Sequence, residues 1–210
     1  MDRVAGSFGF PFRPGSARAW LIGIPLLVVL PIGAIPLLGY SVAIIRSAAD
    51  DPEAGPPAWR PLGRVIRDGL WLALVLAGLS APFALLAILL AGVAARILQP
   101  PVTDPFLAGA LLWVTAAAVA ALPWGILLLV LMPAAIVRFA RSGSPRDLVD
   151  LPAALGLVRS RFGDWNLVVV AIVTAWALGL CGLGLVCLGI FPGVLYALLV
   201  SSHATSDLAE

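Results

Sequence analysis

Four long apolar runs without a charged residue constrain the fold of this chain more than any other feature. They cover residues 20–45, 70–95, 107–137 and 166–201. A helix needs about 20 apolar residues to cross the hydrocarbon core of a membrane, so each run is long enough for at least one crossing. Because a helix satisfies its own backbone hydrogen bonds in lipid, the runs predict an all-α integral membrane protein, a bundle of transmembrane helices.

The composition supports this interpretation. Of the 210 residues, 61% are apolar and 11% are charged, whereas an ordinary soluble domain is about 45–50% apolar and about 25% charged. The mean hydropathy is +1.07. These values exclude a soluble globular enzyme, a disordered chain and a nucleic-acid-binding domain. We therefore expect residues 1–210 to form a single transmembrane domain.

The fourth run decides how many spans we predict. At about 1.5 Å per residue its 36 residues would extend about 54 Å, against a hydrocarbon core of about 30 Å. Its centre, Cys181-Gly182-Leu183-Gly184, is typical of a tight turn. We therefore predict five spans, at about 20–45, 70–95, 107–137, 166–180 and 185–201. The alternative is four spans, with one long tilted or kinked helix as the last.

The arginines indicate an orientation. The connections 46–69 and 138–165 together hold nine arginines, and the N-terminal tail and the short connection 96–106 hold four. The positive-inside rule therefore places the two long connections on the cytoplasmic side of the cell (cytoplasmic) membrane. With five spans the N-terminal tail would lie outside, although it carries three arginines. A first run that re-enters the membrane from one side is the alternative, and its three prolines would permit it.

Each long connection contains an amphipathic stretch, at about 59–68 and 145–163. We predict that both lie as helices along the membrane surface, with a helix start at Ser144 and Pro145 and a break at Pro152. Helices packed over the end of the bundle are the alternative. Arginines on such helices meet anionic lipid phosphates, at about 1 kcal/mol each, as generic anchors or as a dedicated lipid site. The candidate lipid contacts are Arg60, Arg64, Arg67, Arg159 and Arg161.

A short pattern, apolar-Gly-x-x-Pro-x-x-x-Tyr, occurs near both ends of the chain at an offset of 156 residues. Its positions are Gly33, Pro36 and Tyr40, and then Gly189, Pro192 and Tyr196. We interpret the pattern as a weak internal repeat that kinks helices, with chance similarity as the alternative. The two tyrosines are candidates for a hydrogen bond across the repeat or for placement at the membrane interface. Parallel repeats occur in transporters, among other membrane proteins.

Catalytic and metal-binding patterns are missing from the sequence. The two cysteines, Cys181 and Cys187, match neither a redox pair nor a metal site, and His203 is the only histidine. All 11 carboxylates lie in connections or tails, which argues against a proton relay through the membrane. Asp68 and Asp164, each at the start of a span, are the one pair that a lipid-modifying enzyme would use. We therefore expect no enzyme activity, no cofactor and no metal.

Small residues at four-residue spacing indicate close helix packing, within the chain or with a partner. Together with the lack of catalytic and metal-binding patterns, these small residues favour a non-catalytic polytopic protein that is a structural, assembly or accessory component of a membrane complex. Its expected partners are the lipid bilayer and other membrane proteins or a second copy, and not nucleic acid. A small transporter or channel built on the repeat is the alternative, which polar residues deep in the membrane would favour. The candidates for such residues are Ser41, Ser80, Thr115 and Thr174.

Several motifs are also similar to those of a known family. They are Gly39-Tyr40…Arg46, Pro57-Ala58-Trp59…Leu62-Gly63…Asp68-Gly69-Leu70, Pro133-Ala134-Ala135…Arg138-Phe139-Ala140, Asp164-Trp165-Asn166 and Tyr196…Ser202-His203-Ala204. Through them the chain resembles the domain of unknown function 4013 family, from about Phe10 to Asp207. The resemblance implies a small, polytopic prokaryotic protein of the inner membrane, in a family without an assigned activity, and it supplies no catalytic residues. The family usually carries acidic residues after its Pro-x-Trp, where this chain has Arg60 and Pro61.

Overall fold

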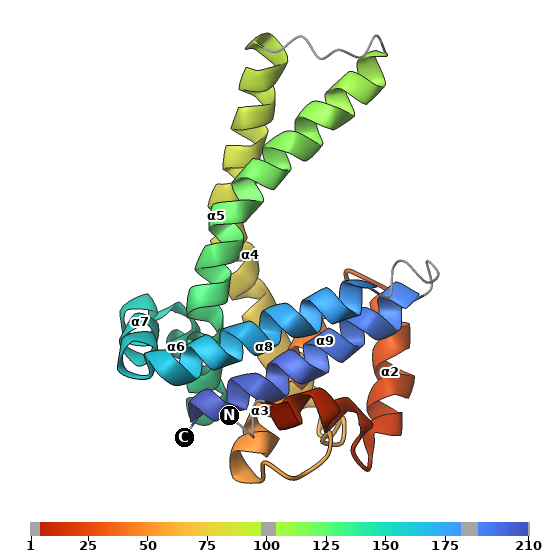
Figure 1. The fold of residues 1–210 in the computed structure, drawn as a ribbon, viewed down its shortest axis with the longest axis vertical. Helices are drawn as coiled ribbons and strands as arrows, with labels where there is room; N and C mark the ends of the chain where they lie inside the picture. Colours follow the sequence, from red (N-terminus) through yellow and green to blue (C-terminus); the bar gives the residue numbers. More distant parts are fainter. Residues whose placement is uncertain (1–4, 98–103, 182–188, 210) are drawn as a thin grey trace. The chain divides into compact units, whose positions relative to one another are not determined.

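The computed structural model describes residues 5–97, 104–181 and 189–209, and every regular element in these ranges is helical (Figure 1). This agrees with the predicted all-α class. The elements are η1 (Ser7–Phe12), α2 (Ser16–Val28), α3 (Ala34–Asp50), α4 (Leu62–Ile97), α5 (Pro105–Ser142), α6 (Arg146–Val149), α7 (Leu151–Ser160), α8 (Phe162–Cys181), α9 (Ile190–Thr205) and η4 (Ser206–Ala209). The chain forms two compact units, a first unit of Met1–Ala73 with Val130–Glu210 and a second unit of Leu74–Leu129.

The second unit consists of the adjoining parts of α4 and α5, and its surface is apolar. Large aliphatic side chains such as Leu89 and Val114 are more than half exposed. The buried positions are instead small ones, Ala87 and Ala91 on α4 and Ala116 and Ala120 on α5. A surface of this kind is stable in lipid and unfavourable in water, because exposed apolar area costs about 25 cal/mol per Å² in water.

Three of the described helices are long and apolar enough to cross a membrane: α4, α5 and α8. Together with the apolar surface they support the prediction of a helical membrane protein. The predicted count of five spans is not confirmed. The first run is divided into two short helices, and of the two helices that the prediction expects in the last run only α8 is among the three long apolar helices.

The first run forms a hairpin, α2–α3, in place of the expected continuous span over 20–45. Helix α2 ends at Val28 and α3 begins at Ala34. Pro31 has no N–H to continue the helix, and the backbone of Gly33 approaches Leu26 so closely that a Cβ there would overlap the Leu26 carbonyl. The chain thus doubles back, and the open ends of the hairpin meet. The backbones of Pro14, before α2, and Gly55, after α3, are in contact.

The last run also forms a hairpin, α8–α9, whose helices lie side by side (Figure 1). The contact is closest at Gly179 and Gly193, where a Cβ on either residue would overlap the other's backbone. The open ends meet where the Arg161 guanidinium donates to the Leu208 carbonyl at 3.2 Å. This antiparallel pair excludes one long last helix. The turn predicted at residues 181–184 lies outside the described residues, apart from Cys181, and so does Cys187.

The two amphipathic stretches differ in how they fold. The stretch 59–68 forms no separate surface helix, because α4 begins at Leu62 and continues without a break. The stretch 145–163 forms α6 and α7, which are separated at Asp150. The Asp150 carboxylate accepts the Ala153 N–H at 3.1 Å and caps α7, with Pro152 in its first turn, where a proline costs no hydrogen bond. Pro145, and not Ser144, is the N-cap of α6.

Helix α9 is the centre of the first unit. Its Leu195 and Leu199 are fully buried and pack in one cluster with Phe10 of η1, Leu27 of α2 and Tyr40 of α3. Helices α2, α3 and α8 and the N-terminal η1 all contact α9. Segments from the two ends of the chain therefore share one core.

Candidate functional site

Polar side chains of the first unit gather where α3 ends, α4 begins and α5 ends. Arg46 of α3 donates from Nε to the Ala140 carbonyl at 2.9 Å and from Nη2 to Asp68 Oδ2 at 3.2 Å. Asp68 is only 2% exposed and also accepts from Arg67 Nη2 at 3.2 Å. A buried carboxylate is stable only when it is paired and hydrogen-bonded. Arg46 therefore joins three helices and holds a fixed orientation.

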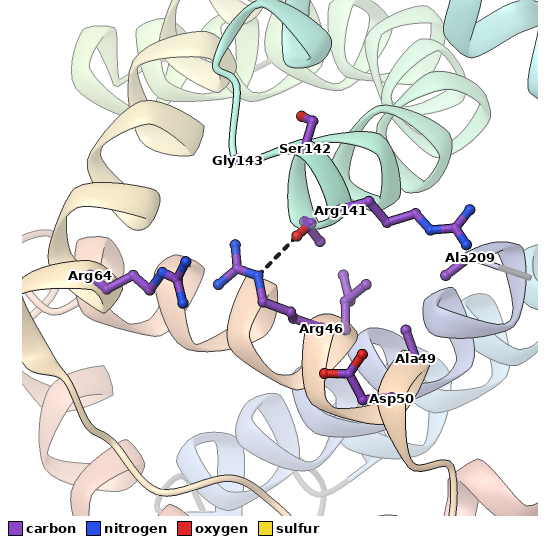
Figure 2. Close-up of a pocket in the computed structure, with 10 residues that line it drawn as sticks. Arg46, Ala49, Asp50, Arg64, Arg141, Ser142, Gly143 and Ala209 are labelled. Atoms are coloured by element: carbon purple, nitrogen blue, oxygen red, sulfur yellow. Dashed lines mark hydrogen bonds between the residues drawn. The ribbon is translucent and has the colours of Figure 1, made fainter.

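A cavity of about 450 Å³ lies beside Arg46 (Figure 2). In Figure 2 the Arg64 side chain reaches toward Arg46, and the Arg141 side chain extends to the opposite side, near Ala209. The lining residues are Ile45, Arg46, Ala49, Asp50, Arg64, Ala140, Arg141, Ser142, Gly143 and Ala209. A smaller cavity of about 240 Å³ shares Arg46, Asp50 and Arg64 with it and adds Arg60 and Asp68. We name the larger cavity the arginine pocket.

The arginine pocket carries a net positive charge. Its lining includes three guanidinium groups and one carboxylate, that of Asp50. Within the ranges that the structure describes, no carboxylate pairs with Arg64 or Arg141. Guanidinium groups form paired hydrogen bonds with phosphate and carboxylate oxygens. Chemically, the arrangement suits an anion.

The structure brings together some of the five arginines that the sequence singles out. Arg60 and Arg64 line the cavities, and Arg67 binds Asp68 beside them. Arg159 is exposed on α7, and Arg161 pairs with Asp164 at 2.7 Å. Neither of these two lines either cavity.

Sequence reasoning missed Arg46 and Arg141 as site residues. Each follows an apolar run, where a single arginine usually anchors a span end. Only the proximity of the α3 and α5 ends reveals their role, and the sequence contains no periodic signal for that proximity. Asp68 and Asp164 take part in separate ion pairs, Asp68 with Arg46 and Arg67 and Asp164 with Arg161.

A second polar cluster surrounds His203 at the end of α9. Ser7 Oγ lies 2.8 Å from His203 Nδ1, and the Pro52 carbonyl lies 3.3 Å from Nε2. Arg13 Nη1 donates to the Pro52 carbonyl at 2.6 Å. Burial lowers the pKa of His203 and the Arg13 charge acts in the same direction, while the Pro52 hydrogen bond and the Glu53 charge oppose them. A neutral ring that donates to Pro52 and accepts from Ser7 satisfies both contacts.

No group of three or more His, Cys, Asp and Glu side chains in the described ranges is arranged to hold a metal ion. Three of the four hydroxyl groups considered as part of a transport path are bonded within their own helices. Ser41 donates to Leu38 O at 2.6 Å, Ser80 to Leu76 O at 2.6 Å and Thr115 to Leu111 O at 2.8 Å. Thr174 is exposed on α8.

The residues of the sequence repeat occupy equivalent places in the two hairpins. Gly33 caps the start of α3 with φ −65° and ψ −16°, and Gly189 caps α9 with φ −67° and ψ −15°. Pro36 and Pro192 are the third residues of their helices, where the N–H has no partner within the helix. The tyrosines bond to separate segments, Tyr40 to Pro57 O at 2.9 Å and Tyr196 to Phe8 O at 3.4 Å. They are therefore not bonded to each other.

Comparison with known proteins agrees with the family resemblance. The family model described as a protein of unknown function (DUF4013) matches residues 22–200. No curated protein and no solved structure matches the chain. The matched segment includes α3, α4, α5, α8 and most of α2 and α9. With most of its length covered, the chain belongs to the DUF4013 family of proteins of unknown function.

Proposed function

We propose that this chain is a non-catalytic, multi-pass protein of a prokaryotic cytoplasmic membrane, acting as a structural, assembly or accessory component of a membrane complex. The observation that carries the proposal is the apolar surface of the second unit, where Ser80 and Thr115 are bonded inside their own helices. Such a surface offers lipid and partner helices apolar contacts only. A polar path would instead need groups turned away from their own helices.

The proposed topology has both chain ends and both long connections on the cytoplasmic side. Hydrogen bonds join Ser7 of the N-terminal tail to His203 and Arg13 to Pro52. A hydrocarbon core about 30 Å thick separates groups on opposite sides far beyond hydrogen-bond distance. Both hairpins open toward these contacts, so the number of crossings is even and five full crossings are disfavoured. The re-entrant first run considered above fits this arrangement, and it accounts for the arginines of the tail.

Reporter fusions test the topology. Alkaline phosphatase is active only where disulfides form, outside the cytoplasm, and should be inactive at either end of this chain. A fluorescent protein that folds in the cytoplasm should be bright at both ends. Active phosphatase at only one end would indicate an odd number of crossings and contradict the proposed topology.

Purification in mild detergent, followed by native mass spectrometry, tests the accessory role. We expect a membrane protein partner or a second copy at fixed stoichiometry. Ala73, Ala77 and Ala81 stand at four-residue spacing on α4, and Ala77 is exposed. Ala77→Leu should reduce recovery of that partner because it blocks close helix approach. Leu85→Met, at another exposed position of the same helix, should not.

The alternative function, a small transporter or channel, has one observation in its favour. The two hairpins are broken helix pairs with glycine caps of the same geometry, and broken helices in repeated positions are common in transporters. Liposomes containing the purified chain provide the test. A monomer that carries ions or small solutes across the bilayer would favour transport over the accessory role.

A further inference from the structure

We propose that the arginine pocket binds a phosphate group, presented in the cell by the headgroup of an anionic lipid. This inference goes beyond the proposed accessory role and does not depend on any protein partner. It uses residues on α3, α4 and α5 that the fold of the first unit brings to one place.

The first argument is a guanidinium that is already held in position. Arg46 is 24% exposed and is bonded to Ala140 O and Asp68. Ordering a free arginine on binding costs rotamer entropy, and a fixed one avoids much of this cost. The C-terminal end of a helix carries a partial negative charge, which would repel an anion. The Arg46 bond to Ala140 O, in the last turn of α5, offsets part of that charge.

The second argument is the charge of the lining. Arg64 and Arg141 have exposed side chains and no carboxylate partner in the described part of the chain. Asp50 is the one acidic residue of the lining, so the lining residues have a formal charge of +2. Asp68, outside this lining, is shared between Arg46 and Arg67 and offsets part of the Arg46 charge. Arg64 and Arg141 therefore supply most of the positive charge that an anion would meet.

The third argument is size and depth. A volume of about 450 Å³ falls within the range of about 300–1,000 Å³ for small-molecule pockets, enough for a phosphate with its glycerol. Arg64 and Trp71 are seven residues apart on α4 and share a face of the helix. Trp71 is exposed, as is Leu70, and the separation along the helix is about 10 Å. Arg64 is therefore about one headgroup layer away from the exposed apolar side chains of Leu70 and Trp71.

The test measures lipid binding by the full chain in mild non-ionic detergent. Phosphatidylglycerol is titrated, and bound lipid is counted by native mass spectrometry. Each arginine removed should weaken binding about fivefold, the factor equivalent to about 1 kcal/mol. Arg64→Ala with Arg141→Ala should therefore weaken it about 25-fold.

The matched control is Arg96→Ala, which removes an exposed arginine of α4 that lies outside both cavities and is not one of the candidate lipid contacts, and it should leave the affinity unchanged. Asp50→Asn should change the affinity in the opposite direction, strengthening binding about fivefold by the same conversion. Since this variant is expected to gain affinity, a folding defect cannot imitate the result. Equal binding by wild type and the double variant, or an equal loss in Arg96→Ala, would overturn the proposal.

A second arm identifies the source of the phosphate. Glycerol 3-phosphate and inorganic phosphate are titrated against the same variants without lipid. Phosphatidylglycerol binding that depends on Arg64 and Arg141 supports the lipid source. Binding of the soluble phosphates alone, with the same dependence, keeps the phosphate pocket but rejects the lipid. None of these results requires the accessory role, so failure of one proposal is distinguishable from failure of the other.

Discussion

The hairpins α2–α3 and α8–α9 begin their second helices in the same way and then pack differently. Both second helices start at a capping glycine with backbone angles that agree within a few degrees. In α8–α9 the two helices of the hairpin touch each other through Gly179 and Gly193. In α2–α3 the second helix instead uses Gly39 against another helix, contacting Val65 and Gly69 of α4.

The difference shows that a local pattern and a packing partner are specified by different residues. The Gly-x-x-Pro segment sets where a helix can begin, because a proline in the first turn replaces an N–H that would lack a partner. Glycines further along the helix set which backbone can approach it, since they have no Cβ to hold the neighbour away. Substitutions at these glycines should separate the two roles.

Substitutions at the α3–α4 contact should have the largest effect. A Cβ at Gly39 would overlap the Val65 carbonyl, and one at Gly69 would overlap the Ile35 carbonyl. Because both obstacles are backbone, Gly39→Ala or Gly69→Ala should lower the free energy of unfolding by about 3 kcal/mol. Unfolding by added sodium dodecyl sulfate in mixed micelles measures this change.

The control for that contact is Gly78→Ala on α4, where nothing lies within 4 Å of an added Cβ. It should be neutral or stabilising by up to about 1 kcal/mol, from helix propensity. A Gly39→Ala protein as stable as wild type would mean that α3 and α4 do not touch in this way.

The α8–α9 contact should respond somewhat less. A Cβ at Gly179 or Gly193 would overlap the partner's carbonyl oxygen less deeply than a Cβ at Gly39 or Gly69 overlaps its own obstacle. For Gly179→Ala or Gly193→Ala we expect a loss of about 2 kcal/mol in the free energy of unfolding, in the same micelle titration. Gly125→Ala, with open space around the added Cβ, is the control. If Gly193→Ala costs more than Gly39→Ala, the last hairpin and not the α3–α4 contact dominates stability.

The tyrosines of the repeat should differ as well. Tyr40 is fully buried, is stacked on Trp59 at 3.9 Å and donates to Pro57 O at 2.9 Å. Tyr196 is half-buried and its bond to Phe8 O is 3.4 Å long. Removing one partner of a buried hydrogen bond costs about 1–3 kcal/mol, so Tyr40→Phe should cost about 1.5 kcal/mol and Tyr196→Phe less than about 0.5 kcal/mol. Thermal unfolding in detergent compares them, and equal losses would make the two tyrosines equivalent.

The parts of this fold that depend on local properties could be predicted from the sequence. Hydrophobicity located the runs, and the cap at Asp150 appeared beside the expected break at Pro152. The division of the first run depends on Gly33 meeting Leu26, a contact between residues that hydropathy treats alike. The sequence predicts a break before residue 70 because a charged residue such as Asp68 usually marks the end of a span. In the structure α4 continues through Asp68, since Arg46 neutralises its carboxylate from another helix.

The candidate site divides in the same manner. Arg60 and Arg64 recur with Arg67 at helical spacing, and this local pattern indicates them as candidates from the sequence alone. Arg141, by contrast, becomes part of the pocket only because α5 ends beside α3. Such proximity between segments about 90 residues apart is set by packing, and a single sequence has no local signal for it.

The smallest effect that we predict is a pH dependence of stability caused by His203, at the end of the last hairpin. The equivalent position in the first hairpin, 156 residues earlier, is Ser47. Burial lowers the pKa of His203 from its ordinary value near 6.5, so the unfolded chain takes up the proton more readily than the folded one. The stability that the neutral ring contributes is therefore complete above about pH 6.5 and declines as the pH falls through that value. The melting temperature should be lower at pH 5.5 than at pH 7.5. His203→Gln, which cannot titrate, should remove that difference, and a difference that persists in this variant would assign the pH dependence to other groups.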